Sequence, residues 1–192
     1  MYHLATGIIM YSTWAPLQTV LNSGPHYILD DQRIWTGPIE EFAIPCGIIS
    51  PIRAELDIFP QEDGLLVRGR ISGRVSQPCN RCTEEAQYDI DSDFDSFEPF
   101  PVEEADSKAE PDPDVDEYFL RYSPLGTGLE INLGALAWEE FAQALPFRPL
   151  CRQDCAGLCA KCGRNLNQGA CQCEQESVDP RLEKLRGLKI KK

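Results

Sequence analysis

The sequence predicts an α+β fold: an antiparallel β-meander core covered by a helix, with a small zinc-knuckle module and a short terminal helix after it. Apolar and polar residues alternate in three consecutive stretches between residues 52 and 95, and apolar residues recur at helical spacing between 132 and 145. In addition, most of the nine cysteines fall between residues 151 and 173. The expected regions are an irregular N-terminal arm (1–45), a β core (46–146) and a cysteine-rich module with a basic tail (147–192).

Prolines interrupt the first 45 residues at short intervals, which is why the arm is expected to be irregular. They are Pro16, Pro25, Pro38 and Pro45. The three alternating stretches that follow have the pattern of half-buried strands. They run from Ile52 to Ile58, from Leu65 to Val75 and from Ala86 to Phe94. Short connections rich in turn residues join them, so an antiparallel meander is expected.

The second strand carries an arginine stripe (Arg68, Arg70 and Arg74) on its polar face. One hypothesis is that this stripe binds RNA. The other is that it pairs with the third strand, which carries aspartates at positions 89, 91, 93 and 95. The sequence favours cross-strand pairing, because exposed ion pairs of this kind form at little energetic cost.

Acidic residues are concentrated in one block. The chain has a net charge of -13, and residues 84–117 contribute 15 acidic side chains and a single lysine to it. The part from 98 to 117 is also rich in proline, which predicts a solvated loop. Docking of a basic partner, such as a ribosomal protein, is the alternative interpretation.

A helix is expected over residues 132–145, because its apolar side chains form one stripe, Asn132 can cap its start and Pro146 ends it. This helix would cover the apolar face of the sheet. A second, short helix is expected after Asp179 and Pro180, which form a typical cap and first-turn pair.

The composition excludes several classes of protein. No apolar run reaches the roughly 18–20 residues that a membrane span needs, and the opening residues do not have the pattern of a secretory signal. A cytoplasmic protein is therefore expected. The net charge of -13 argues against general binding to duplex nucleic acid. No nucleophile motif or dinucleotide fingerprint is present, so neither catalysis nor a small-molecule substrate is expected.

The cysteine spacing is the strongest chemical signal. In the cytosol, dense cysteines favour a metal site over disulfides. Cys159 and Cys162, followed by Gly163, have the spacing of a metal-binding knuckle, and Cys171 and Cys173 can supply the second pair. Four thiolates on one tetrahedral ion make a closed, structural site, and zinc is favoured over an iron–sulfur cluster or unligated thiols.

Other assignments of the cysteines stay open at this stage. Cys155 can replace Cys171 or Cys173, since two ligands separated by one residue crowd a single ion. Alternatively, Cys151 and Cys155 join Cys79 and Cys82 in a second site, or the latter two are reduced thiols in a hairpin. Lone Cys46 is expected to be a small buried apolar residue.

Three blocks of the sequence together resemble one known family. They are the strand pair leading into Pro78-Cys79-Asn80-Arg81-Cys82, the segment from Cys155 to Asn167 with Cys171-x-Cys173, and the closing Asp179-Pro180-Arg181-Leu182-x-x-Leu185. In order and spacing they resemble the YceD family, the large ribosomal RNA subunit accumulation proteins, over roughly residues 30–190. Nothing before about residue 12 matches, and Met10 is as good a start as Met1.

The resemblance implies a role in accumulation of large-subunit (23S) ribosomal RNA and in large-subunit assembly, and hence ribosomal RNA or large-subunit ribosomal proteins as partners. A zinc-stabilised protein–protein adaptor without RNA contact is the alternative. Any RNA or partner contact is expected on the basic surface around the cysteines rather than on the arginine stripe. This expected surface consists of Arg148, Arg152, Lys161, Arg164, Arg181, Lys184 and Arg186.

Overall fold

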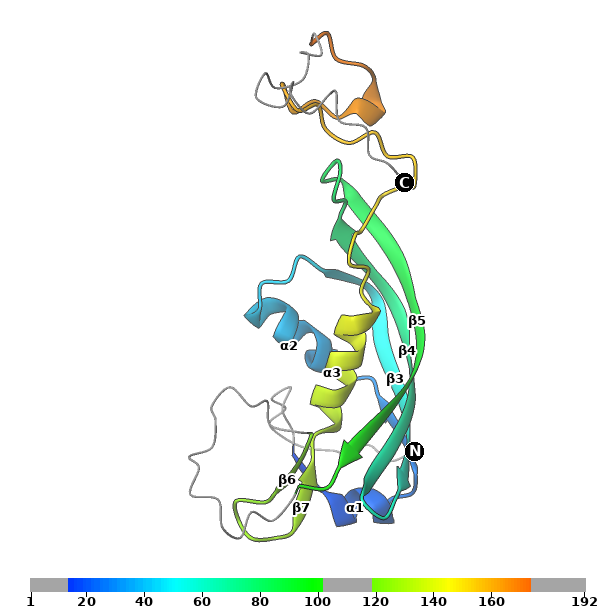
Figure 1. Ribbon diagram of the computed structural model, residues 1–192, viewed down its shortest axis with the longest axis vertical. Coiled ribbons are helices and arrows are strands. Elements are labelled where there is room, and N and C mark those ends of the chain that lie inside the picture. The colour runs from blue at the N-terminus through cyan, green and yellow to red at the C-terminus, as the bar shows by residue number, and fades with distance from the viewer. Residues whose placement is uncertain (1–13, 102–118, 174–192) are drawn as a thin grey trace, which may run out of the picture.

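The computed structural model describes residues 14–101 and 119–173, which form two antiparallel sheets, three α-helices and a cysteine-rich segment (Figure 1). The α+β prediction is confirmed. The expected terminal helix, most of the acidic segment and the surface residues Arg181, Lys184 and Arg186 lie outside the described residues.

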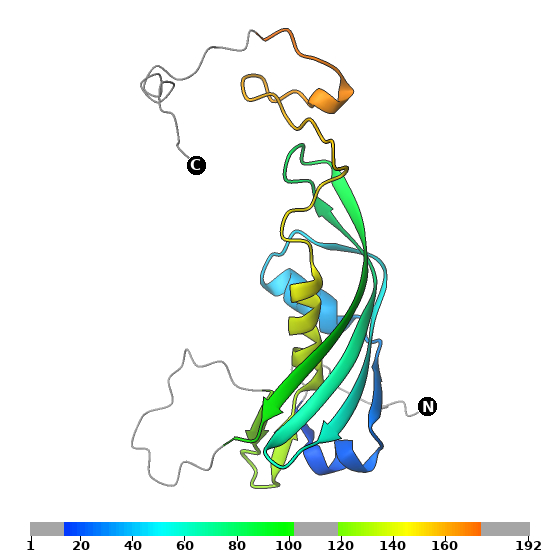
Figure 2. The same ribbon diagram turned by 45° about the vertical axis from the view of Figure 1, so that its right-hand side comes forward.

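The larger sheet contains the predicted meander. Its strand order is β2-β3-β4-β5, and every neighbouring pair is antiparallel. The strands are β2 (His26–Leu29), β3 (Gly47–Pro60), β4 (Gly64–Pro78) and β5 (Glu85–Pro99). The three long strands extend beyond the alternating stretches, so that the β4–β5 hairpin projects past the rest of the sheet (Figures 1 and 2).

One face of this sheet is apolar and the other is charged. Ile52, Leu56, Val67 and Ile71 are each no more than 1 % exposed, as their alternation predicts. On the other face, the cross-strand interpretation of the arginine stripe is confirmed. Arg68 contacts Asp95 at 3.2 Å, Arg70 contacts Asp91 and Asp93 at 2.5 and 3.2 Å, and Arg74 contacts Asp89 at 2.8 Å.

Two helices, α2 (Arg33–Glu41) and α3 (Leu133–Ala144), cover the apolar face (Figure 1). Helix α3 begins as predicted, because the Asn132 side chain accepts a hydrogen bond from the Ala135 N–H at 3.0 Å. The two helices meet through Trp35 and Phe141, both fully buried, whose ring centroids are 5.5 Å apart. Aromatic contact of this kind fixes how the helices pack on the sheet.

The expectation of an irregular N-terminal arm is wrong for its described part. Residues 15–41 contain β1 (Ala15–Pro16), α1 (Leu17–Asn22), β2 and α2, and β2 extends the larger sheet. The prolines stand where they cost few hydrogen bonds: Pro16 directly precedes α1 and Pro25 directly precedes β2. Only Pro38 lies inside a helix.

The smaller sheet has the order β1-β7-β6, with β6 at Leu120–Tyr122 and β7 at Leu129–Ile131. It precedes α3 directly and places β1 beside β7. The predicted solvated loop from residue 98 is also corrected at its start. Glu98 belongs to β5 and is 5 % exposed, and Phe100 packs against the core. Strand β5 thus continues to Pro99, beyond Phe94, where the predicted alternating stretch ends.

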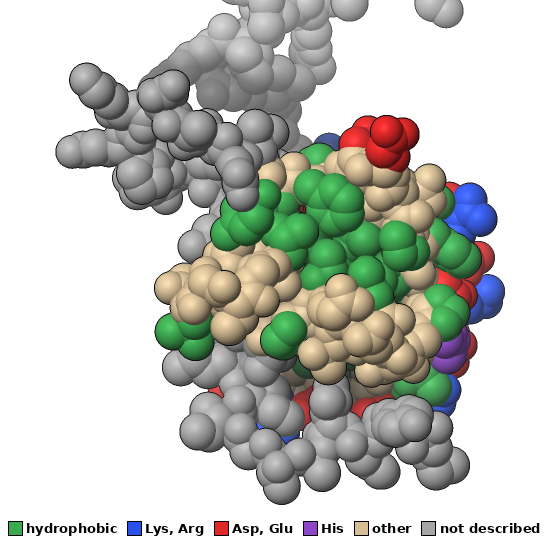
Figure 3. Space-filling model, turned by 90° about the horizontal axis from the view of Figure 1, so that it is seen from below, with side chains coloured by type: hydrophobic (Ala, Val, Ile, Leu, Met, Phe, Trp, Pro, Cys, Tyr) green, Lys and Arg blue, Asp and Glu red, His purple; other side chains and the backbone are tan. Residues whose placement is uncertain are grey.

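Apolar side chains gather at the end of the molecule that carries α1 and the β3–β4 turn (Figure 3). Next to this turn, strand pairing places Phe59, Leu66 and Phe97 in one row across three strands. Phe59 and Phe97 are 39 % and 46 % exposed. None of the helices within the described residues has the length and apolarity required to cross a membrane.

Candidate metal centres

The tip of the β4–β5 hairpin and the segment after α3 lie at the same end of the molecule (Figures 1 and 2). Eight cysteine sulfurs gather there in two groups of four, and the sulfurs of each group lie within 4.8 Å of one another. The hairpin cluster consists of Cys79, Cys82, Cys151 and Cys155. The knuckle cluster consists of Cys159, Cys162, Cys171 and Cys173.

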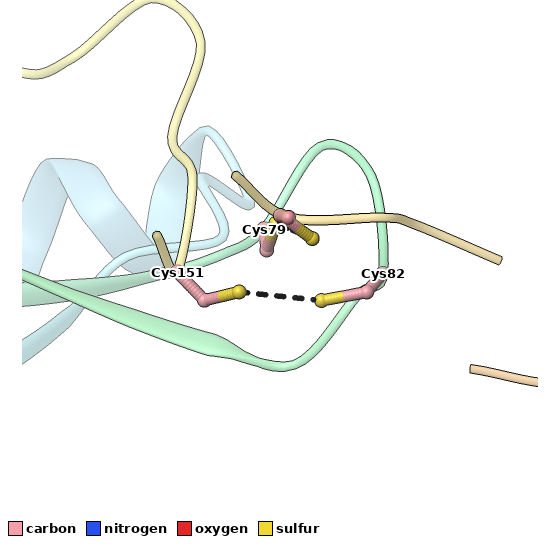
Figure 4. A group of neighbouring side chains, drawn as sticks. Cys79, Cys82 and Cys151 are labelled. Carbon is pink, nitrogen blue, oxygen red and sulfur yellow. Dashed lines mark hydrogen bonds between the residues drawn. The ribbon is translucent and has the colours of Figure 1, made fainter. Parts of the chain in front are cut away.

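The hairpin cluster joins two parts of the chain that are far apart in sequence. The Sγ atoms of Cys79 and Cys155 are 3.8 Å apart. Those of Cys82 and Cys151, joined by the dashed line in Figure 4, are 3.5 Å apart. Cys79, Cys82 and Cys155 are buried, whereas Cys151 is exposed. Ala86, Tyr88 and Leu150 pack around the buried sulfurs and form a small apolar cluster with them, and Tyr88 also packs against the main core.

Backbone contacts fix the segment on the hairpin. The Asn80 N–H donates to the Pro149 carbonyl at 2.8 Å, and the Leu158 N–H donates to the Arg81 carbonyl at 3.0 Å. The Arg81 guanidinium donates to the Cys155 carbonyl at 2.9 Å, and the Tyr88 hydroxyl donates to the Leu150 carbonyl at 2.8 Å. These bonds surround the four sulfurs and hold both ligand pairs in place.

The knuckle cluster is formed locally. The Cys159 N–H donates to the Arg164 carbonyl at 2.8 Å, and the Gly163 N–H returns to the Cys159 carbonyl at 2.9 Å. Gly163 has φ +69°, the positive value that the spacing predicts for the exit of such a turn. The Sγ atoms of Cys171 and Cys159 are 3.3 Å apart. Between the two ligand pairs lies a short 3-10 helix, η1 (Leu166–Gln168).

The sulfur geometry fits a tetrahedral metal ion. With a metal–sulfur bond of about 2.3 Å, neighbouring sulfurs of a tetrahedron lie about 3.8 Å apart. The separations of 3.8, 3.5 and 3.3 Å approach that edge length and are far longer than the roughly 2.05 Å of a disulfide. Each cluster can therefore hold a metal ion with four sulfur ligands, which leaves no coordination position for a substrate.

Proton sharing within the clusters prepares them for a cation. Burial acts to raise the pKa of Cys79, but backbone N–H groups outweigh it and lower that pKa to about 6. Backbone N–H groups also lower the pKa of Cys159 to about 6. A hydrogen bond with Cys82 raises the pKa of Cys151 to about 12, and one with Cys162 raises that of Cys173 to about 12. In the hairpin cluster, a hydrogen bond from Asn167 also lowers the pKa of Cys155, and burial raises that of Cys82. Each cluster thus contains thiols with lowered pKa beside thiols with raised pKa.

The structure brings Cys151 and Cys155 to Cys79 and Cys82, and it groups Cys171 and Cys173 with the knuckle. Cys155 belongs to the hairpin cluster and does not replace a knuckle sulfur. Cys46 lies outside both clusters and is only half-buried, with burial raising the pKa of its thiol.

The family model described as "Large ribosomal RNA subunit accumulation protein YceD" matches residues 67–189, which include most of β4, all of β5 and α3, and all eight clustered cysteines. The chain belongs to the YceD family. The matched residues make up almost two thirds of the chain.

Relatives of this YceD-family chain include the "Large ribosomal RNA subunit accumulation protein YCED homolog 1, chloroplastic" of Arabidopsis thaliana, 26% identical over 68% of this chain and 46% of that protein. An uncharacterized protein of Mycobacterium tuberculosis is 28% identical over 77% of this chain and 65% of its own length. The chain thus spans between about half and two thirds of these relatives. No solved structure matches it.

Two residues of this YceD-family chain that contact the hairpin cluster were not predicted as site residues. Asn167, in η1, donates from Nδ2 to the Cys155 sulfur at 3.2 Å. Arg81 bridges the hairpin to the cysteine segment, as described above. Both lie inside the blocks that carry the family resemblance, but their contacts cross between segments distant in sequence, so spacing alone gave no signal for them.

The expected basic surface is partly within the described residues. Arg148, Arg152, Lys161 and Arg164 are all exposed on the cysteine-rich segment. Arg152 is 3.5 Å from Asp154 and donates to Asn167 Oδ1 at 2.7 Å, so part of its charge is used inside the YceD-family segment itself.

Proposed function

We propose that this chain is a non-catalytic, cytoplasmic factor that supports accumulation of large-subunit ribosomal RNA and assembly of the large ribosomal subunit. The observation that carries this proposal is the match to the YceD family model across the hairpin, α3 and both cysteine clusters. A chloroplast relative whose name refers to large ribosomal RNA subunit accumulation adds support.

The ion proposed for the knuckle cluster is Zn²⁺, bound by Cys159, Cys162, Cys171 and Cys173. An all-sulfur tetrahedral set is the typical environment of structural zinc, which has no preferred geometry of its own and no redox chemistry. Such an ion would supply folding free energy to a segment with few apolar side chains. It would act as a structural ion rather than as a catalyst.

The proposed partner is large-subunit ribosomal RNA or a large-subunit ribosomal protein, held by the basic surface that includes Arg148, Lys161 and Arg164. Cations that are exposed and held on a rigid segment suit a phosphate backbone. The arginine stripe is less suitable, because aspartates pair with each of its three members.

The test is co-sedimentation of the full chain with pre-ribosomal particles, followed by comparison of variants. Weaker binding to the particles, with a smaller dependence on salt, is expected for the quadruple variant Arg164→Gln/Arg181→Gln/Lys184→Gln/Arg186→Gln. The matched control is Arg68→Gln/Arg70→Gln/Arg74→Gln, which should co-sediment as the unaltered chain does. The opposite pattern would show that the wrong surface has been assigned. Unchanged large-subunit ribosomal RNA in a deletion strain would contradict the function itself.

A protein adaptor without RNA contact is the second candidate, and the apolar end of the molecule favours it (Figure 3). Exposed apolar side chains grouped at one end are typical of protein-binding surfaces. In the same sedimentation experiment, association that survives RNase and is lost in a Phe59→Ser/Phe97→Ser variant would support the adaptor over the RNA-binding factor.

A further inference from the structure

The two Cys-x-x-Cys turns have the same backbone geometry, although only one of them was recognised as a knuckle. In the hairpin, the Thr83 N–H donates to the Cys79 carbonyl at 2.9 Å and the Cys79 N–H donates to the Glu84 carbonyl at 2.8 Å. The equivalent bonds around Cys159 are 2.9 and 2.8 Å. This agreement between a hairpin tip and a loop indicates that both turns serve to position a pair of cysteine sulfurs.

Thr83 pays a conformational cost to keep this turn. Its φ is +62°, close to the +69° of Gly163, but a β-branched side chain is disfavoured in this region. Strained backbone of this kind persists where the surroundings over-determine it, and it concentrates at ligand sites. Here the strained residue directly follows Cys82, and the sulfurs of Cys79 and Cys82 lie within 4.8 Å of each other.

The sulfurs of Cys151 and Cys155 complete the group of four. Three of the four sulfurs are buried, and four hydrogen bonds between the hairpin and the cysteine-rich segment hold the two pairs together, as described above. Their separations of 3.8 and 3.5 Å are close to the edge of a tetrahedron of thiolates around one ion.

We propose that the hairpin cluster is a second zinc site, which joins the β4–β5 hairpin to the cysteine-rich segment and is coupled to the knuckle site through Asn167. This second ion goes beyond the function proposed above and does not depend on whether the chain binds RNA.

The coupling follows from the four hydrogen bonds of the Asn167 amide. Nδ2 donates to Cys155 Sγ at 3.2 Å and to Asn165 Oδ1 at 2.9 Å. Oδ1 accepts from the Ala156 N–H at 2.8 Å and from Arg152 at 2.7 Å. Every donor and acceptor of this amide is therefore used, which fixes its orientation toward a ligand of the hairpin site.

The chain around Asn167 is held by the other site. Asn167 lies between Cys162 and Cys171, so an ion bound to both closes the loop that carries it. The N–H···S bond from Asn167 would then be pre-positioned for Cys155. Contacts of this kind to ligand atoms orient them and commonly change metal affinity by about 10–100-fold. Because coupling is reciprocal, each ion would raise the affinity for the other.

The first test is the zinc content of the purified full chain, measured by elemental analysis together with mapping of disulfides. Two zinc ions per chain are expected, falling to one in Cys79→Ser/Cys82→Ser and staying at two in Cys46→Ser, the ninth cysteine. One zinc in the unaltered chain with no loss in Cys79→Ser/Cys82→Ser would overturn the second site. So would a disulfide linking hairpin-cluster cysteines. Two ions in a chain that fails to bind particles would refute the proposed function alone.

The second test is competition between the zinc-loaded chain and a chromophoric chelator. Asn167→Asp keeps the acceptor but lacks the N–H donor, so it should release the hairpin ion at about tenfold lower chelator concentration. Gln168→Ala, an exposed neighbour in η1, should behave as the unaltered chain. In a Cys159→Ser/Cys162→Ser background, the Asn167→Asp effect should shrink. Equal release from Asn167→Asp and the unaltered chain, or an equally large effect in that background, would overturn the coupling.

Discussion

Gly163 is one residue on which the knuckle depends for its shape. Its φ of +69° lies in the left-handed region, and a Cβ added there would meet nothing within 4 Å. A Cβ at this position would therefore be opposed by backbone strain, about 1–2 kcal/mol, rather than by a steric clash.

For Gly163→Val we expect about tenfold weaker metal binding at the knuckle cluster, since about 1.4 kcal/mol corresponds to a factor of ten. Chelator competition measures this loss. The control is Ala160→Val, an exposed position in the same turn, which should change affinity little. Equal affinities for Gly163→Val and the unaltered chain would show that the turn does not depend on this conformation.

Glu98 is a buried carboxyl group in β5, 5 % exposed and hydrogen-bonded to Ser96 at 2.6 Å. Burial raises its pKa, the Ser96 bond lowers it, and the nearby Glu139 raises it again, with a raised pKa as the result. The folded protein thus holds this proton more tightly than the unfolded chain does. Stability contributed by Glu98 is present at low pH and is lost as pH rises through the folded-state pKa.

Glu98→Gln keeps an acceptor for Ser96 but carries no charge, so it should raise the thermal midpoint at pH 7. A gain of about 2–4 °C is expected for each kcal/mol recovered in a domain of this size. The gain should disappear below about pH 4, where the ordinary carboxyl is protonated in both states. The exposed Glu62→Gln serves as the control, and thermal unfolding at the two pH values gives the comparison. A midpoint that falls at pH 7 would contradict the assignment.

At the scale of elements, Gln32 connects the N-terminal region to the larger sheet. Its side chain donates to the Ile52 carbonyl at 2.9 Å and accepts from the Ile52 N–H at 3.0 Å. The pairing of β2 with β3 ends at Leu29 and Ala54, so Ile52 lies beyond the last β2 partner. The glutamine takes the place of a neighbouring strand.

Gln32→Ala should lower the thermal midpoint, because it leaves two backbone groups of the fully buried Ile52 without these partners. The expected cost is about 1–3 kcal/mol, or at least about 2–4 °C. Gln18→Ala is the matched control, since the exposed Gln18 bonds only to Asn22 one turn along α1. Equal midpoints for the two variants would mean that the contact with Ile52 contributes nothing.

The elements that were predicted are those whose pattern is periodic and local. The alternation in β3, β4 and β5 and the stripe of α3 follow from which side chains face the core. The prediction of an irregular N-terminal arm was wrong because the elements there are short. Helix α2 also contains Pro38, which local propensity disfavours in a helix, but the contact between Trp35 and Phe141 stabilises it. The pairing of the arginine stripe with the aspartates of β5 was predicted correctly because every second residue of a strand faces the same side of the sheet.

The two cysteine clusters also differ in how far the sequence alone predicted them. The knuckle cluster is local, so its four cysteines were named from spacing, whereas the hairpin cluster was one alternative among several. Its assembly depends on tertiary contacts such as that between Asn80 and Pro149, which leave no trace in spacing. Thr83 also concealed the second turn, since glycine is expected where φ is positive.

At the scale of the whole molecule, residues 14–101 and 119–173 form two apolar clusters of unequal size. The main core contains Trp35, Phe141 and the inward side chains of the sheet, while the smaller one surrounds the hairpin cluster. Few apolar side chains support the smaller cluster apart from its cysteines, so its integrity would depend on metal.

Removal of metal with a chelator should therefore loosen the cysteine-rich segment and leave the sheet and its helices folded. Limited trypsin digestion of the full chain should then cut at Arg152, Lys161 and Arg164, while far-ultraviolet circular dichroism of the β core changes little. Re-addition of Zn²⁺ should restore protection, and Mg²⁺, which prefers oxygen ligands, should not. Digestion that is equally fast with and without chelator would contradict this dependence on metal.

The hairpin cluster also sets an order of events during synthesis. Cys79 and Cys155 are 76 positions apart, and Cys82 and Cys151 are 69 apart. At about 5–20 residues per second, the hairpin thiols wait roughly 4–15 s for their partners to be made. During that interval the emerging polypeptide presents half of a coordination site, which can bind an ion only weakly or react with an oxidant. Binding of the ion by all four sulfurs can therefore occur only after translation has passed the end of α3.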